Sequence, residues 1–341
     1  MRQNCIIYGS FKGMGDLLSA AHYVRAELDA GNNVKLLLFP SKALLEFAEL
    51  IDFGTCRDNL EICQIPTSGK PLDLIRYFQK MAKYSPKLVW VSPHAPRTAS
   101  SWKIPLLLWI TKKIFWPGAK LAGVSSEHLS FLFDVRIPVS RDLPIAMREH
   151  IAYGLAKNNV QPMRPARFVQ RIHDVRQAHP KYDLVIHPGA NAPNRKWPTA
   201  HLVKVVRMIP EQYKIAVVGI KEEIQEIMGI LADNVNVDFI AGSLEQAITT
   251  IAQARVLFCM DSGSVHFSKA LGVPCVALFG NCNYKNVIDP GEHDAYIYER
   301  KFSCQPCGRA TCLHQSAYCI DSILPETVAS NIISMLKIYK A

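Results

Sequence analysis

Residues 255–280 constrain the fold more than any other part of this chain. Residues 255–260 are a short apolar run of the kind that fills a buried parallel strand. The small polar residues 261–264 (Asp-Ser-Gly-Ser) follow, then a short helical segment and a second apolar run. A strand, a glycine turn and a helix in this order are typical of a parallel α/β sheet. The unpaired backbone N–H groups and the dipole at the start of such a helix predict a phosphate-binding turn.

Strand-like runs and helical patterns alternate along the whole chain, and in each half the first strand ends in a glycine-bearing turn. Residues 162–180, rich in Arg, Pro and Gln and without a strand-like run, are the expected linker. The pattern predicts an α/β fold with two Rossmann-like domains, residues 1–165 and 166–324. A helix within residues 325–341 must pack on an apolar surface, with the first domain as one candidate. We expect strands at 4–8, 34–39, 88–92, 121–124, 183–187, 214–219 and 235–240, and helices at 16–30, 199–208 (capped by Thr199), 222–232 and 244–254 (capped by Ser243).

Composition narrows the possible partners. The 341 residues favour two domains, and the formal net charge of +10 favours anionic partners. Basic residues are spread along the chain and no zinc-finger or RNP-type motif is present, so nucleic acid is not an expected partner. No apolar run reaches about 18 residues, and the apolar part of the N-terminus is too short for a signal peptide. We therefore expect a cytoplasmic protein.

Polar residues follow several of the expected strands, and each has two interpretations. Asp16 ends a Gly-Met-Gly-Asp turn, where it either caps the first helix or acts as a general base toward a hydroxyl group. Arg195 and Lys196 precede a helix and either neutralise a diphosphate or lie in a solvated loop. Glu222 and Glu223 follow a glycine that ends a strand, and are either ordinary first-turn residues or ligands of ribose hydroxyls.

Four cysteines and a histidine lie within sixteen residues near the C-terminus: Cys304, Cys307, Cys312, His314 and Cys319. The two-residue gap lets Cys304 and Cys307 bind one metal ion, with Cys312 and Cys319 completing a tetrahedral set. The later gaps are shorter than those between the usual pairs of zinc ligands, so a reduced, metal-free loop is the alternative. We expect a structural zinc or iron rather than a catalytic one.

Residues 102–117 combine three Trp with three Lys in an apolar setting. Such a helix either lies on a membrane surface, takes up a lipid-linked acceptor, or packs in an ordinary core.

Together these segments resemble the heptosyltransferases of lipopolysaccharide core synthesis, glycosyltransferase family nine. The resemblance lies in the order of the motifs: Gly-x-Gly-Asp, then Pro-Gly-Ala with a basic-Trp-Pro loop, then Asp-Ser-Gly-x-x-His before Ala-Leu-Gly-Val-Pro. It spans residues 13–328 and is most specific at 261–280. The cysteine segment and the Leu-Pro-Glu-Thr-Val after it resemble the heptosyltransferase II branch in particular.

The resemblance implies the GT-B arrangement, in which two Rossmann-like domains face a central cleft. It also implies an ADP-heptose donor and inverting, metal-independent transfer to a lipopolysaccharide inner-core acceptor, with no cofactor required for catalysis. By position, Asp16 in the acceptor-binding first domain matches the general base. The usual Lys-Arg-Trp-Pro is Arg-Lys-Trp-Pro here, so which cation meets the phosphate stays open, and Asp-Thr-Gly is Asp-Ser-Gly, which keeps the hydroxyl. The donor-binding positions of the second domain are matched by Arg195, Lys196, Glu223, Asp261, Ser262, Gly263 and His266.

The implied partners are an ADP-sugar, a lipid-linked oligosaccharide and, through it, a peripheral contact with the cytoplasmic face of the inner membrane. Two other functions fit the same residues. One is a GT-B glycosyltransferase with another nucleotide-sugar donor, or with a protein or another glycan as acceptor. The other is a non-catalytic module that binds a nucleotide sugar.

Overall fold

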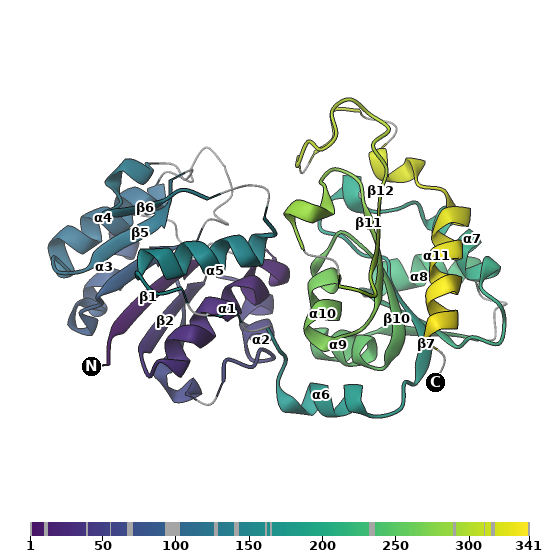
Figure 1. Ribbon diagram of the computed structural model, residues 1–341, viewed down its shortest axis with the longest axis horizontal. Coiled ribbons are helices and arrows are strands. Elements are labelled where there is room, and N and C mark those ends of the chain that lie inside the picture. The colour runs from purple at the N-terminus through teal and green to yellow at the C-terminus, as the bar shows by residue number, and fades with distance from the viewer. Residues whose placement is uncertain are drawn as a thin grey trace. The chain divides into compact units, whose positions relative to one another are not determined.

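A computed structural model shows two compact α/β units, Met1–Arg167 and Phe168–Ala341 (Figure 1). Each unit is built around its own parallel sheet and its own core. The structure describes residues 2–9, 13–38, 40–54, 56–66, 71–92, 103–125, 129–139, 143–160, 162–163, 166–231, 236–288, 291–309, 311–314 and 318–339.

The first unit contains a six-stranded sheet in the order β3-β2-β1-β4-β5-β6, in which every neighbouring pair is parallel. The chain therefore builds outward from β1 in one direction and then from β4 in the other, so the order reverses between these two strands. The strands are β1 (Asn4–Gly9), β2 (Asn33–Leu38), β3 (Leu60–Gln64), β4 (Leu88–Val91), β5 (Lys120–Val124) and β6 (Val135–Ile137).

Helices pack in two groups in this unit. In one group α1 contacts α2 and α5, and in the other α3 contacts α4. The apolar face of each helix is buried against the sheet. A core of Phe78, Trp116 and Phe133 among aliphatic side chains lies under the second group. The helices are α1 (Met14–Asp29), α2 (Lys42–Ala48), α3 (Pro71–Lys80), α4 (Lys103–Phe115) and α5 (Ile145–Ala156), with short 3-10 turns η1 (Arg57–Asn59), η2 (Ala82–Tyr84) and η3 (Ser130–Leu132).

The second unit repeats this topology with the order β12-β11-β10-β7-β8-β9, again parallel throughout. Its order reverses between β7 and β10. The strands are β7 (Tyr182–His187), β8 (Ile215–Gly219), β9 (Val237–Ala241), β10 (Ala254–Met260), β11 (Cys275–Phe279) and β12 (Ala295–Tyr298). The helices are α6 (Gln170–Gln177), α7 (Thr199–Met208), α8 (Lys221–Leu231), α9 (Leu244–Ala252), α10 (Gly263–Leu271) and α11 (Pro325–Ile338), with 3-10 turns η4 (Pro193–Arg195), η5 (Tyr284–Asn286) and η6 (Cys319–Ser322).

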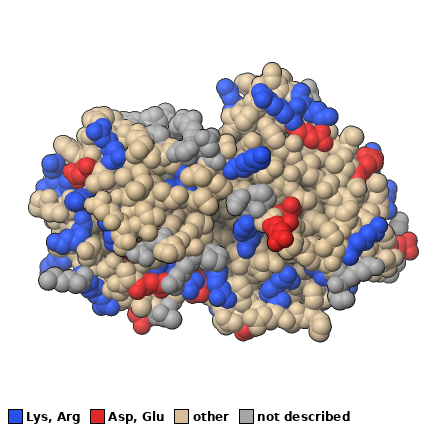
Figure 2. Space-filling model, in the orientation of Figure 1, with Lys and Arg blue, Asp and Glu red and all other residues tan. Residues whose placement is uncertain are grey.

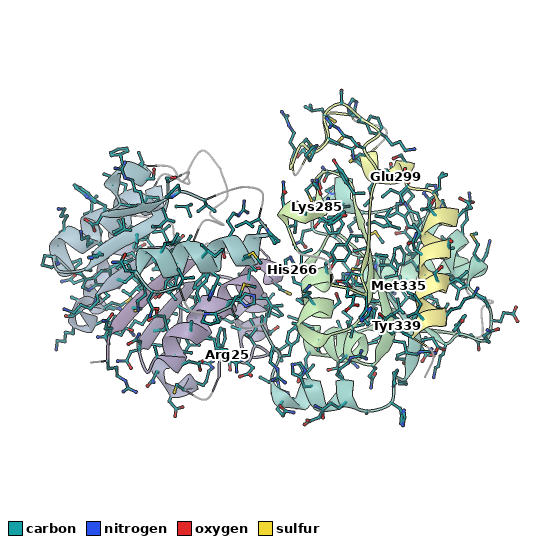
Figure 3. All side chains as sticks on the ribbon, in the orientation of Figure 1. Arg25, His266, Lys285, Glu299, Met335 and Tyr339 are labelled. Carbon is teal, nitrogen blue, oxygen red and sulfur yellow. The ribbon has the colours of Figure 1, made fainter. Side chains whose placement is uncertain are left out.

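The C-terminal helix α11 is part of the second unit's core. Val328, Ile332 and Leu336 are fully buried at four-residue spacing, and Met335, labelled in Figure 3, lies in the same cluster. Helix α11 packs beside α7 against β10 and β11 (Figure 1). These contacts already bury its apolar face, so packing on the first domain is not needed to explain the helix.

The α/β fold with two Rossmann-like units is confirmed, and all nine expected strands are present. The seven given by range lie within a residue or two of their predicted ends, and the two apolar runs of residues 255–280 form β10 and β11. The Ser243 hydroxyl caps α9 as expected by accepting a hydrogen bond from the Gln246 N–H, at 3.2 Å. The predicted cap at Thr199 is wrong: Pro198 is the N-cap residue of α7 and Thr199 is its first helical residue. Three short strands, β3, β6 and β12, and four helices, α2, α3, α5 and α6, were not predicted; α6 lies inside the expected linker.

On the face shown in Figure 2, Lys and Arg are spread over both units rather than gathered in one stripe. Among the described residues, no helix is both long and apolar enough to cross a membrane.

Tight packing in β5 gives a test of the first unit's core. A Cβ added at Gly123 would lie 2.5 Å from Cε2 of the Phe133 ring, which is itself buried. We expect Gly123→Ala to lower the free energy of unfolding, measured by urea titration, by about 1–3 kcal/mol because the ring has to shift. Gly118→Ala is the matched control, since nothing lies within 4 Å of its added Cβ, and should change stability by less than about 0.5 kcal/mol. Equal stability of the two variants would contradict this packing.

Candidate functional site

The second unit brings two loops together at the point where its strand order reverses. β7 and β10 are parallel neighbours with Cys259 opposite His187, so the residues that follow each strand leave the same edge side by side. Gly189 comes two residues after His187, and Asp261 two residues after Cys259. Ligands of open α/β sheets bind at this edge, beside the point of reversal.

Helix α10 begins at this edge and supplies an anion-binding terminus. Ser262 is the N-cap residue, and its hydroxyl accepts a long 3.4 Å hydrogen bond from the Ser264 N–H. Gly263 is the first helical residue, and His266 lies on the first turn (Figure 3). The free N–H groups of a first turn and the helix dipole favour a phosphate at this place.

Asp261 is buried, only 5% exposed, and two side chains hold its carboxylate. Arg195 Nη1 lies 3.4 Å from Oδ2, and the Cys282 thiol donates a hydrogen bond to the same oxygen at 3.0 Å. Burial, and then the charge of Asp261, raise the pKa of Cys282 well above its ordinary value, so the thiol stays protonated and keeps donating. Asp261 therefore fixes the guanidinium of Arg195 beside the start of α10.

Glu223 lies in a space that two glycines leave open. A Cβ at Gly189 would be 2.7 Å from Glu223 Oε2, and one at Gly219 would be 3.3 Å from it. Lys196 Nζ donates to Glu223 Oε1 at 2.7 Å. The His187 ring also lies close to Gly189, since a Cβ added there would be 3.1 Å from the ring's Cε1. Burial lowers the pKa of His187 below its usual range. Glu223, rather than the exposed Glu222, therefore faces this site.

A small pocket of about 80 Å³ lies between the Lys196–Glu223 pair and the core. Its lining mixes polar and apolar side chains, which suits a ligand with both kinds of surface. Trp197 is mainly a core residue, because its ring is buried and its Nε1 donates to the Ile323 carbonyl at 3.2 Å. The lining residues are Pro188, Lys196, Trp197, Thr199, Leu202, Glu223, Glu226, Ile227 and Met260.

Asp16 lies in the first unit, on the first turn of α1 after β1. The Gly13 N–H donates to Asp16 Oδ2 at 3.2 Å, so the carboxylate caps its helix. The capping hydrogen bond occupies one lone pair of one carboxylate oxygen, and an ionised carboxylate can accept several hydrogen bonds. The capping and general-base interpretations of Asp16 are therefore compatible.

The segment 102–117 is largely a core helix where the structure describes it. Trp116 is buried and Trp109 packs against the same cluster, whereas Ile114 is exposed. Trp102 lies outside the described residues.

The cysteine segment, residues 304–319, is tied to the end of β11. Gln305 Nε2 donates to the Gly280 carbonyl at 2.7 Å. Cys304 Sγ lies 3.9 Å from His314 Nε2, and the buried Cys319 thiol has its pKa raised to about 11, first by burial and then by Cys307 and Cys312. All ten cysteines are free thiols, and within the described ranges no three His, Cys, Asp or Glu side chains are grouped as a metal site.

The structure brings several of the sequence-predicted residues together at this edge and adds neighbours that the sequence did not indicate. Cys282, His187 and Gly189 were not singled out as site residues. A glycine two residues beyond a strand would have been a usable signal for Gly189, but nothing near Cys282 in the sequence indicates that it contacts Asp261.

Comparison with known proteins gives the family. The family model described as "Glycosyltransferase family 9 (heptosyltransferase)" matches residues 100–317, well over half of the chain. A curated relative, lipooligosaccharide heptosyltransferase 2 of Campylobacter jejuni, is 27% identical over 165 residues, which are 45% of this chain and 51% of the relative. The chain thus spans about half the length of that relative.

Solved structures agree with the fold. E. coli ADP-heptose LPS heptosyltransferase II matches with a TM-score of 0.66 and 18% identity over 100% of both chains. A family 9 glycosyl transferase from Veillonella parvula matches with a TM-score of 0.72 and 15% identity, over 98% of this chain and 97% of that one. These similarities confirm the fold class, that of the GT-B heptosyltransferases. Since the family model covers well over half of the chain, the chain belongs to glycosyltransferase family 9, the heptosyltransferase family.

Proposed function

We propose that this protein is an inverting glycosyltransferase that moves a heptose from ADP-heptose to an inner-core acceptor of lipopolysaccharide. One observation carries the proposal: the reversal point of the second sheet assembles a helix N-terminus, the Arg195–Asp261 pair and the Lys196–Glu223 pair at one edge. Cations and N–H groups bind a diphosphate, and a carboxylate binds ribose hydroxyls. Membership of family 9 and the resemblance to an ADP-heptose heptosyltransferase support the same donor.

The two cations have different roles in this proposal. Arg195 is held by Asp261 at the start of α10, and a guanidinium with five N–H donors keeps others for a phosphate. Lys196 instead pairs with Glu223 and orients its carboxylate toward the ribose. Arg195 is therefore the cation that meets the diphosphate, while Gly263 and His266 complete the turn around it.

In the reaction, Asp16 takes the proton of the acceptor hydroxyl as its oxygen attacks the anomeric carbon. The bond from that carbon to the diphosphate breaks on the opposite face, so the configuration inverts. Negative charge grows on the departing ADP, where Arg195 and the N-terminus of α10 are already in position to stabilise it. This scheme needs no catalytic metal ion.

Acceptor and location follow from this chemistry as part of the proposal. An inner-core acceptor is attached to lipid, so the enzyme works in the cytoplasm with a peripheral contact at the cytoplasmic face of the inner membrane. The rival functions are transfer from another nucleotide sugar, transfer to a protein or another glycan, and binding without catalysis.

A transfer assay tests the proposal. With ADP-heptose and a set of truncated core acceptors, we expect mass spectrometry to show one added heptose, and no addition with a panel of UDP- or GDP-sugars. Asp16→Asn should lower kcat by about 10²–10⁴-fold and leave the Kd for ADP within about twofold, because it removes only the base. Full turnover of this variant would show that Asp16 is not the base, and ADP binding without any transfer by the wild type would favour the non-catalytic module.

The glycines around Glu223 give a second prediction. Gly189→Ala places a methyl group 2.7 Å from Glu223 Oε2 and should push the carboxylate away from the ribose. We expect calorimetry to give a roughly tenfold weaker Kd for ADP, because the free energy of about one charge-assisted hydrogen bond would be lost. Gly229→Ala in α8 is the control, since its added Cβ meets nothing within 4 Å. Unchanged ADP affinity in Gly189→Ala would argue against the ribose role of Glu223.

Cys304, Cys307, Cys312 and Cys319 remain the proposed ligands of a structural zinc or iron, although the described side chains are not gathered into a metal site, so binding would require them to move together. Protein purified without chelator should contain about one equivalent of metal by elemental analysis, and Cys304→Ser with Cys307→Ser should lose it. Wild-type protein with less than about a tenth of an equivalent would remove the metal from the account.

A further inference from the structure

Three buried amide side chains of the second unit bind the cysteine segment to its surroundings. Asn194, Asn281 and Gln305 are 2%, 1% and 2% exposed. Among the described residues, the Oδ1 atoms of Asn194 and Asn281 have no hydrogen-bond partner, so the cost of burying these two amides is only partly offset. Groups that break a packing rule in this way are expected where they serve a functional site. The mechanism proposed above uses neither asparagine.

The Asn194 and Asn281 amides donate to the same atom. Their Nδ2 groups lie 2.9 and 2.7 Å from the carbonyl oxygen of Arg309. A carbonyl oxygen only accepts hydrogen bonds, so it fixes the orientation of both amides. In return, the Gly308 N–H donates to the Asn281 carbonyl at 2.8 Å. The backbone of residues 308–309 is therefore bound both to the loop before α7 and to the loop after β11.

The residue that follows each asparagine belongs to the proposed donor site. Arg195 follows Asn194 within the 3-10 turn η4, and Cys282 follows Asn281. Asp261 Oδ2 lies between these two residues, 3.4 Å from Arg195 Nη1 and 3.0 Å from the Cys282 sulfur. The two loops are thus joined twice, by a backbone carbonyl at one residue and by a carboxylate at the next.

The two connections have different effects on Arg195. Asp261 sets the direction of the guanidinium, but the ion pair is long and the Arg195 side chain is 32% exposed, so the pair does little to resist motion of the loop. The backbone of η4 has to be held by other contacts. The hydrogen bond from Asn194 to Arg309 is one of them, and the packing of η4 against η6 is another.

We propose that Asn194 and Asn281 are positioning residues for the cation that binds the diphosphate. Through the Arg309 carbonyl they hold η4 in place, so that Arg195 stays beside the start of α10. This inference rests on the proposed role of Arg195. Both amides are buried and act through the backbone that they bind, which makes residues 308–309 a structural part of the donor site.

Asn194→Ala tests the proposal, because it removes one donor to the Arg309 carbonyl and leaves Arg195 in the chain. We expect calorimetry to give a Kd for ADP about five- to tenfold weaker, since the guanidinium is no longer held against the diphosphate. In an Arg195→Ala background the same substitution should change this Kd by less than about twofold, because no guanidinium is left to position. Asn281→Ala should behave in the same way, and it serves if Asn194→Ala does not fold.

Ile332→Val is the control for a general loss of stability. Ile332 is fully buried in the core of the same unit, on α11, and the loss of one methyl group should lower the Tm. The Kd for ADP should stay within about twofold of the wild-type value, since a conservative change in the distant core leaves η4 in place.

The two ways in which the account can fail are distinguishable. If Arg195→Ala weakens ADP binding but the asparagine variants do not, or if they weaken it equally in both backgrounds, this inference alone is overturned. If Arg195→Ala leaves ADP binding unchanged, the role of Arg195 in the proposed function is overturned, and this inference with it.

Discussion

Parallel pairing of every strand is the constraint on which this structure depends. Each strand must be followed by a crossover before the next can pair in the same direction, so all strands end at one edge and the following helices begin there. In both sheets the order reverses once, between β1 and β4 and between β7 and β10. Asp16 follows β1 and Ser92 follows β4 in the first sheet. In the second sheet, Gly189 lies just beyond β7 and Asp261 just beyond β10.

Charge is organised differently at the two edges. In the second unit, carboxylates at Asp261 and Glu223 are each paired with a neighbouring cation, which fixes that cation rather than leaving it mobile. In the first unit, the Asp16 carboxylate accepts a hydrogen bond from the Gly13 N–H at the start of its own helix. The proposed transfer requires positive charge for the leaving diphosphate and a base for the acceptor hydroxyl, and it assigns the first to the second unit and the second to the first.

The sequence predicts what depends on local pattern. Long apolar runs such as those of β1 and β10 are buried along nearly their whole length, and these strands were found. β3, β6 and β12 were missed because most of their residues are only partly buried, which leaves little periodic signal. Helix α6 was missed because polar residues dominate it and only Ile172 is buried.

The site residues also divide into those that a local sequence pattern marks and those that only the fold brings together. Arg195, Lys196 and Asp261 stand in motifs, so sequence order was enough to select them. Cys282 stands in no motif, and it was identified only through its contact with Asp261, 21 positions away. Only folding brings these partners together, so no local reading of the sequence could have found them.

A crystal structure with ADP bound tests the central claim most directly. The account predicts the diphosphate against the N–H groups of Gly263 and Ser264 and the guanidinium of Arg195, with the ribose hydroxyls on Glu223. ADP bound elsewhere on the second unit, or with its ribose away from Glu223, would contradict it.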